Sequence, residues 1–232
     1  MLTLHRRAIL GLCMAGAATA LGGCKRTTST TKPQLSMSAA PAYAAEGIYG
    51  PVADRFPIAG VDVSQIDPIY LRREVAYASS YPAGTVVIDP SAHFLYLVQP
   101  GGTAIRYGVG VGKEGFGWSG DATINSKQEW PDWYPPKEMI QRRPDIQAQL
   151  TRLQSGEGVP GGLSNPLGAR AMYLWQNGRD TLYRIHGTLE PDTIGTNVSS
   201  GCIRMINQDA IDLYGRVGVG AKVVVLGAKA GA

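Results

Sequence analysis

The chain has 232 residues, which is long enough for one buried core and additional segments. Its hydrophobic fraction of 44% excludes wholesale disorder, and its apolar residues are too scattered for several membrane spans. The formal net charge is only +4 and no run of four Lys or Arg occurs, so nucleic acid is not an expected partner. The 30 glycines favour turns and short strands over long helices.

Residues 1–23 have the pattern of an export signal. Arg6 and Arg7 precede an apolar run over residues 8–21, which is short for a membrane span, so a permanent membrane anchor is disfavoured. The arginine pair also resembles a twin-arginine signal. The residues up to Cys24 resemble a bacterial lipobox, in which the cysteine is lipidated. We therefore expect an exported, periplasmic protein held at a bacterial envelope membrane by a lipid on Cys24, with ordinary cleavage as the alternative.

Three further regions follow. Residues 24–45 are rich in Thr, Ser, Ala and Pro without hydrophobic periodicity, which predicts a flexible tether. Residues 46–83 are expected to be an irregular N-terminal segment with a short helix over residues 68–77. Residues 84–227 show closely spaced short strands and turn signals, which predict one globular domain.

The domain begins with strands predicted at residues 85–88, 93–98 and 103–109, a meander typical of a sandwich or small barrel. Residues 112–136, rich in Gly, Trp and Pro, come next, and helices are predicted over residues 136–142 and 144–154.

The second half adds strands at residues 169–175 and 181–186, separated by an Asn177-Gly178 turn. Asn207 is expected to be the N-cap of a helix that ends at Val217, and residues 223–226 to form a buried closing strand. The predicted fold class is mainly β, a β-sandwich-like domain with a few short helices.

Cys202 and His186 are the candidate nucleophile and base. A thiol is mostly protonated at neutral pH, and a neighbouring imidazole can take its proton. Glycine directly before the cysteine leaves room for backbone amides to stabilise an oxyanion. The alternatives are a buried structural cysteine and a metal site. Because only His93 and Cys24 would accompany this pair after export, a four-ligand zinc site is hard to build. We expect no metal and no cofactor, and a structural role for His93.

Two motifs occur in a fixed order around this pair. They are His186-Gly187-Thr188 and Ser199-Ser200-Gly201-Cys202-Ile203-Arg204-Met205. Their order and spacing resemble the L,D-transpeptidase catalytic domain family (YkuD-type, ErfK/YbiS/YcfS/YnhG-like), and the resemblance covers about residues 84–227. Residues 165–174 also look like the strand that leads to that family's site. One position departs from the pattern, because Ser200 stands where the family usually has histidine.

The resemblance implies an acyltransferase of the cell wall with no cofactor. Cys202 would attack a stem tetrapeptide and form a thioacyl-enzyme, with His186 as base and the Gly187 carbonyl orienting its ring. The amides of Gly201 and Cys202 would bind the oxyanion, and Ser200 could donate a hydrogen bond. The implied partners are peptidoglycan stem peptides and, as one acceptor, a lipoprotein.

Several roles stay open at this stage. Arg204 could fix the loop, bind a substrate carboxylate or form a structural salt bridge. Tyr173 and Trp175 could line the pocket, although core packing is favoured. A tryptophan group could form a lid or a satellite core; its members are Trp118, Trp130 and Trp133.

The function could be 3-3 crosslinking, lipoprotein attachment or hydrolysis by a carboxypeptidase or endopeptidase. A non-catalytic wall-binding protein is the main alternative from another class. A thiol redox protein is disfavoured because no C-x-x-C motif occurs.

Overall fold

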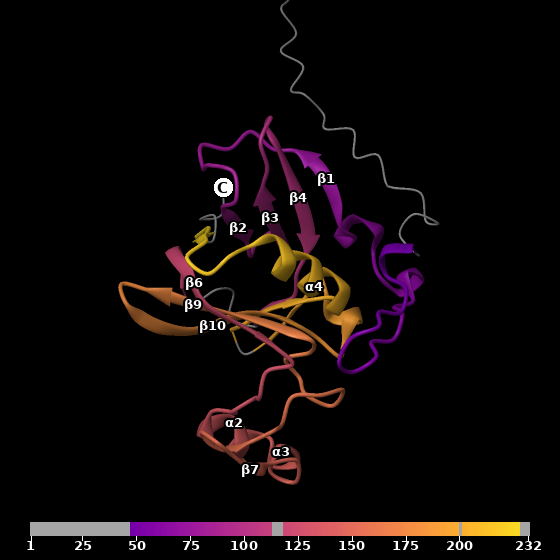
Figure 1. Cartoon of the computed structure of the whole chain (residues 1–232), viewed down its shortest axis with the longest axis vertical. Helices are drawn as coiled ribbons and strands as arrows, with labels where there is room; N and C mark the ends of the chain where they lie inside the picture. Colours follow the sequence, from indigo (N-terminus) through magenta and orange to yellow (C-terminus); the bar gives the residue numbers. More distant parts are fainter. Residues whose placement is uncertain (1–46, 113–117, 200, 228–232) are drawn as a thin grey trace, which may run out of the picture. The chain divides into compact units, whose positions relative to one another are not determined.

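A computed structural model describes residues 47–112, 118–199 and 201–227 (Figure 1). The predicted signal (1–23), the predicted tether (24–45), Cys24 and Ser200 lie outside these residues. Within the described residues, no helix is long and apolar enough to cross a membrane.

One nine-stranded sheet organises the domain, in the order β1-β4-β3-β2-β13-β6-β9-β10-β12. Its strands are β1 (Arg73–Ala76), β2 (Val86–Asp89), β3 (Phe94–Val98), β4 (Thr103–Gly108), β6 (Gly120–Glu129), β9 (Arg170–Gln176), β10 (Arg179–Gly187), β12 (Ile203–Met205) and β13 (Lys222–Val225). Two small sheets pair β5 (Val111–Gly112) with β11 (Asn197–Ser199) and β7 (Thr151–Leu153) with β8 (Gly156–Gly158).

In the described part of the chain, the helices that have both ends described are few and short. They are α2 (Lys137–Arg142), α3 (Pro144–Gln147), α4 (Asn207–Arg216) and the 3-10 turns η1 (Val63–Gln65), η2 (Pro68–Tyr70) and η3 (Pro191–Thr193). The mainly β class predicted from the sequence is therefore confirmed.

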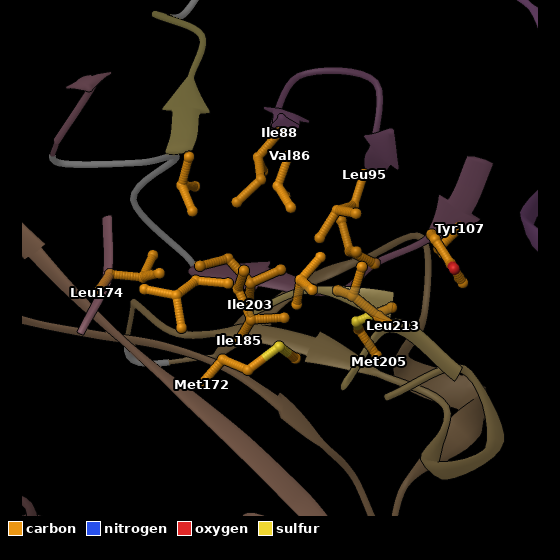
Figure 2. Packing of buried hydrophobic residues seen from close by; sticks show 14 of the residues in the cluster. Val86, Ile88, Leu95, Tyr107, Met172, Leu174, Ile185, Ile203, Met205 and Leu213 are labelled. Carbon is orange, nitrogen blue, oxygen red and sulfur yellow. The ribbon is translucent and has the colours of Figure 1, made fainter. Parts of the chain in front are cut away.

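The main core lies between the two halves of the sheet. Figure 2 shows Val86 and Ile88 of β2 opposite Met172, Ile185 and Ile203 of the other half. Leu213 of α4 belongs to the same cluster. The sandwich-like character thus arises from one continuous sheet whose two halves share a core, instead of from two separate sheets.

The predicted meander is present, because β2, β3 and β4 pair antiparallel in chain order. The Asn177-Gly178 turn is also present, with φ of 51° and 74°, as a two-residue hairpin of this type requires.

Three local predictions were wrong. Residues 68–77 form the turn η2 followed by strand β1, which pairs with β4 at the sheet edge, instead of a helix. The second predicted helix ends at Gln147, and the β7–β8 hairpin replaces its C-terminal half. Ile206, and not Asn207, occupies the N-cap of α4, because the Asn207 amide bonds to two distant backbone groups.

The N-terminal segment packs on residues that lie between the two motifs and directly after the second one. Tyr49 and Ile66 form a buried cluster with Ile194 and Ile206. Residues 47–83, although outside the predicted domain, therefore contribute directly to the scaffold around the candidate site.

Candidate active site

Strand alternation places the candidate residues on the sheet face opposite the core. Ile185 of β10 and Ile203 of β12 are fully buried in the core, so His186 and Arg204 project from the other face. β10 and β12 run parallel, with His186 opposite Arg204. Cys202 directly precedes β12, and a backbone hydrogen bond links it to Arg184. The fold therefore places Cys202 beside β10, two residues before Arg204, which is the register partner of His186.

His186 is buried, with 4% of its surface exposed. Its Nδ1 lies 2.5 Å from the Gly187 carbonyl oxygen, the contact that the family resemblance implied. Because a carbonyl can only accept, Nδ1 carries the proton and Nε2 remains an acceptor in the neutral ring. Burial lowers the pKa of His186 to about 4, with smaller contributions from the positive charges of Arg204 and Arg184, while the Gly187 bond opposes the shift.

Cys202 is half-buried. Burial raises the pKa of its thiol, whereas the backbone hydrogen bond at Arg184 and the charges of Arg184 and Arg204 act in the opposite direction. At neutral pH the pair therefore consists of a neutral thiol and a neutral imidazole. A proton must move to His186 while the sulfur attacks, which is general-base catalysis rather than a preformed thiolate.

Arg184 is a site residue that the sequence analysis missed. Its guanidinium makes a bidentate pair with Asp180, with both N–O distances 2.8 Å, and lies 4.6 Å from the centre of the Tyr173 ring. The i, i+2 spacing from His186 on a strand is the signal that could have found it, because such residues share a face.

Tyr173 lies on the site face and not in the core. It alternates with the buried Met172 and Leu174, pairs with Arg184 across the strands, and its hydroxyl donates to Gln128 at 2.8 Å. Trp175 has the same parity on β9 and is half-buried. The core role that the sequence favoured for Tyr173 was therefore wrong.

Arg204 forms the structural salt bridge that the sequence had left open. Its Nη1 lies 2.8 Å from a Glu190 carboxylate oxygen, and its backbone exchanges two 2.9 Å hydrogen bonds with Gly110. Both contacts hold the start of β12. His93 has a comparable structural contact, since its Nε2 lies 2.8 Å from Asn197 Oδ1 in β11.

The three tryptophans singled out in the sequence have different partners. Trp118 stacks on Tyr183 with ring centroids 5.6 Å apart, whereas Trp130 packs edge-on against Phe56 at 5.0 Å. Trp133 pairs through its backbone with Val159. Trp118 packs against the main core, and Trp130 belongs to a separate buried cluster with Ile58 and Ala169.

Two motif glycines are required by their surroundings. Gly201 has φ of 131°, and a Cβ there would come within 2.9 Å of the Tyr183 ring. A Cβ on Gly187 would overlap the side-chain amide of Asn207. The described part of the chain holds no group of three or more His, Cys, Asp or Glu side chains arranged to bind a metal ion.

The sequence of the domain matches the model of a known family. Residues 83–225 match the family model described as YkuD, L,D-transpeptidase catalytic domain. The chain belongs to this L,D-transpeptidase catalytic domain family.

Particular relatives agree with that assignment. A probable L,D-transpeptidase YcfS of Escherichia coli K12 is 33% identical over 153 residues, which cover 62% of this chain and 44% of the relative. A putative L,D-transpeptidase of Fuscovulum blasticum is 29% identical over 229 residues, covering 97% of this chain and 98% of the relative. The chain spans less than half the length of the Escherichia coli relatives it matches.

A solved Brucella melitensis chain, described as a probable carnitine operon oxidoreductase, is 51% identical. The match covers 71% of this chain and 99% of that chain, with a TM-score of 0.46. A superposition at this TM-score adds nothing to the family assignment, which rests on the family model and the sequence relatives.

Proposed function

We propose that the protein is a peptidoglycan L,D-transpeptidase that forms a thioacyl-enzyme on Cys202. The observation that carries the proposal is the parallel pairing of β10, which carries His186, with β12, which Cys202 directly precedes, together with the contact that fixes the His186 ring on the Gly187 carbonyl. The family and its relatives support the substrate class, a stem tetrapeptide of the bacterial wall.

The proposed acylation step follows from the two neutral side chains. The Cys202 sulfur attacks the carbonyl carbon of the third stem residue, and its proton passes to Nε2 of His186. The amides of Gly201 and Cys202 donate to the oxyanion, where negative charge develops. The carbon–nitrogen bond to the terminal D-alanine then breaks, and His186 returns the proton to the departing amine.

Deacylation reverses the proton path. An acceptor amine attacks the thioester, gives a proton to His186, and displaces the Cys202 sulfur, which is reprotonated. We propose a second stem peptide or a lipoprotein lysine as the acceptor, and water gives hydrolysis instead. We also propose that the protein acts in the periplasm, tethered to the membrane through a lipid on Cys24.

Product analysis tests the proposal. The full chain is incubated with a disaccharide-tetrapeptide, and the products are identified by mass spectrometry. Release of D-alanine together with a crosslinked dimer is the expected result. Release of D-alanine without a dimer would replace the transpeptidase by a hydrolase, and no reaction with any stem peptide would reject the substrate class.

A further inference from the structure

The side chain of Asn207 connects the start of β9 to the end of β10, the strand that carries His186. Its Oδ1 accepts a hydrogen bond from the backbone amide of Ala169 at 2.9 Å, at the start of β9. Its Nδ2 donates to the carbonyl of Thr188 at 2.9 Å, directly after β10. One amide group therefore links the residue that follows His186 and Gly187 to the residue that precedes the neighbouring strand β9.

Two glycines make room for this amide. A Cβ on Gly168 or on Gly187 would overlap Asn207 Oδ1, and the Cβ of Gly168 would also press on the Gly187 backbone. The Asn207 amide thus lies directly against the Gly187 peptide, whose carbonyl accepts the hydrogen bond from His186 Nδ1.

The two residues that follow Asn207 in the first turn of α4 are held by the N-terminal segment. The buried Gln208 donates from Nε2 to the carbonyls of Gly50 and Ala59, each at 3.0 Å. The next residue, Asp209, is fully buried and accepts a hydrogen bond from the Tyr49 hydroxyl at 3.0 Å. The N-terminal segment therefore anchors the turn from which Asn207 reaches the site.

We propose that Asn207 is a positioning residue for His186. By holding the Gly187 peptide in place, it keeps the proton on Nδ1 and leaves Nε2 as the acceptor for the thiol. Only an amide of this length both accepts from Ala169 and donates to Thr188, whereas aspartate would face the Thr188 carbonyl with a second acceptor. The catalytic consequence rests on the proposed function of His186 as the base.

The test follows the His186 ring by ¹⁵N NMR in the full chain, with His186→Gln and His93→Gln used for assignment. The variants are Asn207→Asp, which is isosteric, and Asn207→Ser, which cannot reach Thr188. Asn165→Asp is the matched control. Asn165 is fully buried whereas Asn207 is half-buried, but its amide likewise bridges backbone groups: it donates to the carbonyls of Pro131 and Val159 and accepts from the Leu167 amide at 2.9 Å.

We expect the wild-type ring to be the Nδ1–H tautomer. Both Asn207 variants should populate the Nε2–H tautomer, whereas Asn165→Asp should lose thermal stability with an unchanged ring. Turnover of the tetrapeptide should fall by about 10²-fold in kcat in the Asn207 variants with KM little changed, because the base is misplaced.

The proposal is overturned if a folded Asn207 variant keeps the Nδ1–H ring and wild-type kcat, or if the wild-type ring is Nε2–H. Should neither variant fold, the wild-type ring decides, since Nδ1–H supports the proposal and Nε2–H overturns it. The NMR result does not need a wall substrate. A wild-type protein that fails to process the tetrapeptide would therefore count against the proposed function and not against the Asn207 assignment.

Discussion

His186 in β10 and Asp209 in the first turn of α4 are two buried titratable residues, and burial shifts their pKa values in opposite directions. The pKa of His186 falls to about 4 and that of Asp209 rises to about 7, in both cases mainly because burial disfavours the charged form. The same physical cause thus keeps a base neutral at one position and favours a neutral acid at the other.

Their partners separate a candidate catalytic group from a structural one. His186 has a single backbone partner for Nδ1 on the candidate site face. Asp209 instead belongs to a network in which Tyr49 donates to it and Arg72 lies 3.5 Å away. Because Arg72 also pairs with Asp212 at 2.8 Å, its charge remains compensated when Asp209 is protonated. A shifted pKa therefore marks a candidate site only where the fold also places a reactive partner beside it.

The sharpest contrast between the two residues is expected in turnover. His186→Gln should lower kcat for the tetrapeptide by roughly 10²- to 10⁴-fold, because the general base is lost. Asp209→Asn, which mimics the protonated acid, should stay within a few-fold of wild type. Steady-state kinetics measures kcat for both variants, with circular dichroism as a folding control. Equal losses of kcat in two folded variants would contradict a catalytic role for His186 and a structural one for Asp209.

The two residues should also affect the pH dependence of the free energy of unfolding in opposite ways. Between about pH 4 and 6.5, folded His186 binds fewer protons than unfolded histidine. Its contribution to the free energy of unfolding is therefore present above that range and is lost as the pH falls to about 4. Folded Asp209 binds more protons than unfolded aspartate, so its contribution is present below the ordinary aspartate pKa and is lost as the pH rises to about 7.

The two slopes oppose each other in the wild type. Asp209→Asn should therefore leave a free energy of unfolding that rises with pH between about 4 and 6.5, and His186→Gln one that falls. Urea titrations at closely spaced pH values measure this. Slopes that match the wild type in both variants would show that the pKa shifts are absent.

Thiol reactivity should show that the pair is neutral at rest. Because the Cys202 pKa is raised, alkylation by iodoacetamide should keep accelerating into the alkaline range without a plateau near neutral pH. The acid limb of kcat/KM should lie near pH 4, the pKa of His186 in the folded chain. A thiolate that reacts fully at pH 6 would contradict both expectations.

The smallest expected effect concerns the exposed partner of Arg204. Glu190→Gln removes a 2.8 Å ion pair whose carboxylate side chain is 64% exposed. The loss in the free energy of unfolding should be below about 1 kcal/mol, because water already screens such a pair. Urea titration checks this, and a larger loss would mean that the salt bridge is a main support of β12.

The sequence predicted the features that depend on local pattern. Cys202, His186 and the Gly187 carbonyl belong to two short motifs. β2 follows from a β-branched run, and β3 and β4 follow from alternation between turns. The central strand β6 escaped prediction because only Ala122 and Ile124 are buried along its ten residues, so its apolar signal is weak.

The remaining features depend on contacts between distant segments. Asn207 fits an N-cap by residue type, but its amide bonds to groups 38 and 19 positions away. Tyr49 meets Asp209 across 160 positions, in a segment whose own pattern is irregular. Such pairings are set by the strand order of the whole sheet, which no local pattern encodes.

The central claim is that Cys202 is acylated with His186 as its base. The most direct test is peptide mapping by mass spectrometry after the full chain meets a disaccharide-tetrapeptide, with wild type, Cys202→Ala and His186→Gln compared. We predict an acyl group on Cys202 in the wild type, none in Cys202→Ala, and slow accumulation in His186→Gln. An acyl group on another residue, or equal acylation rates with and without His186, would contradict the account.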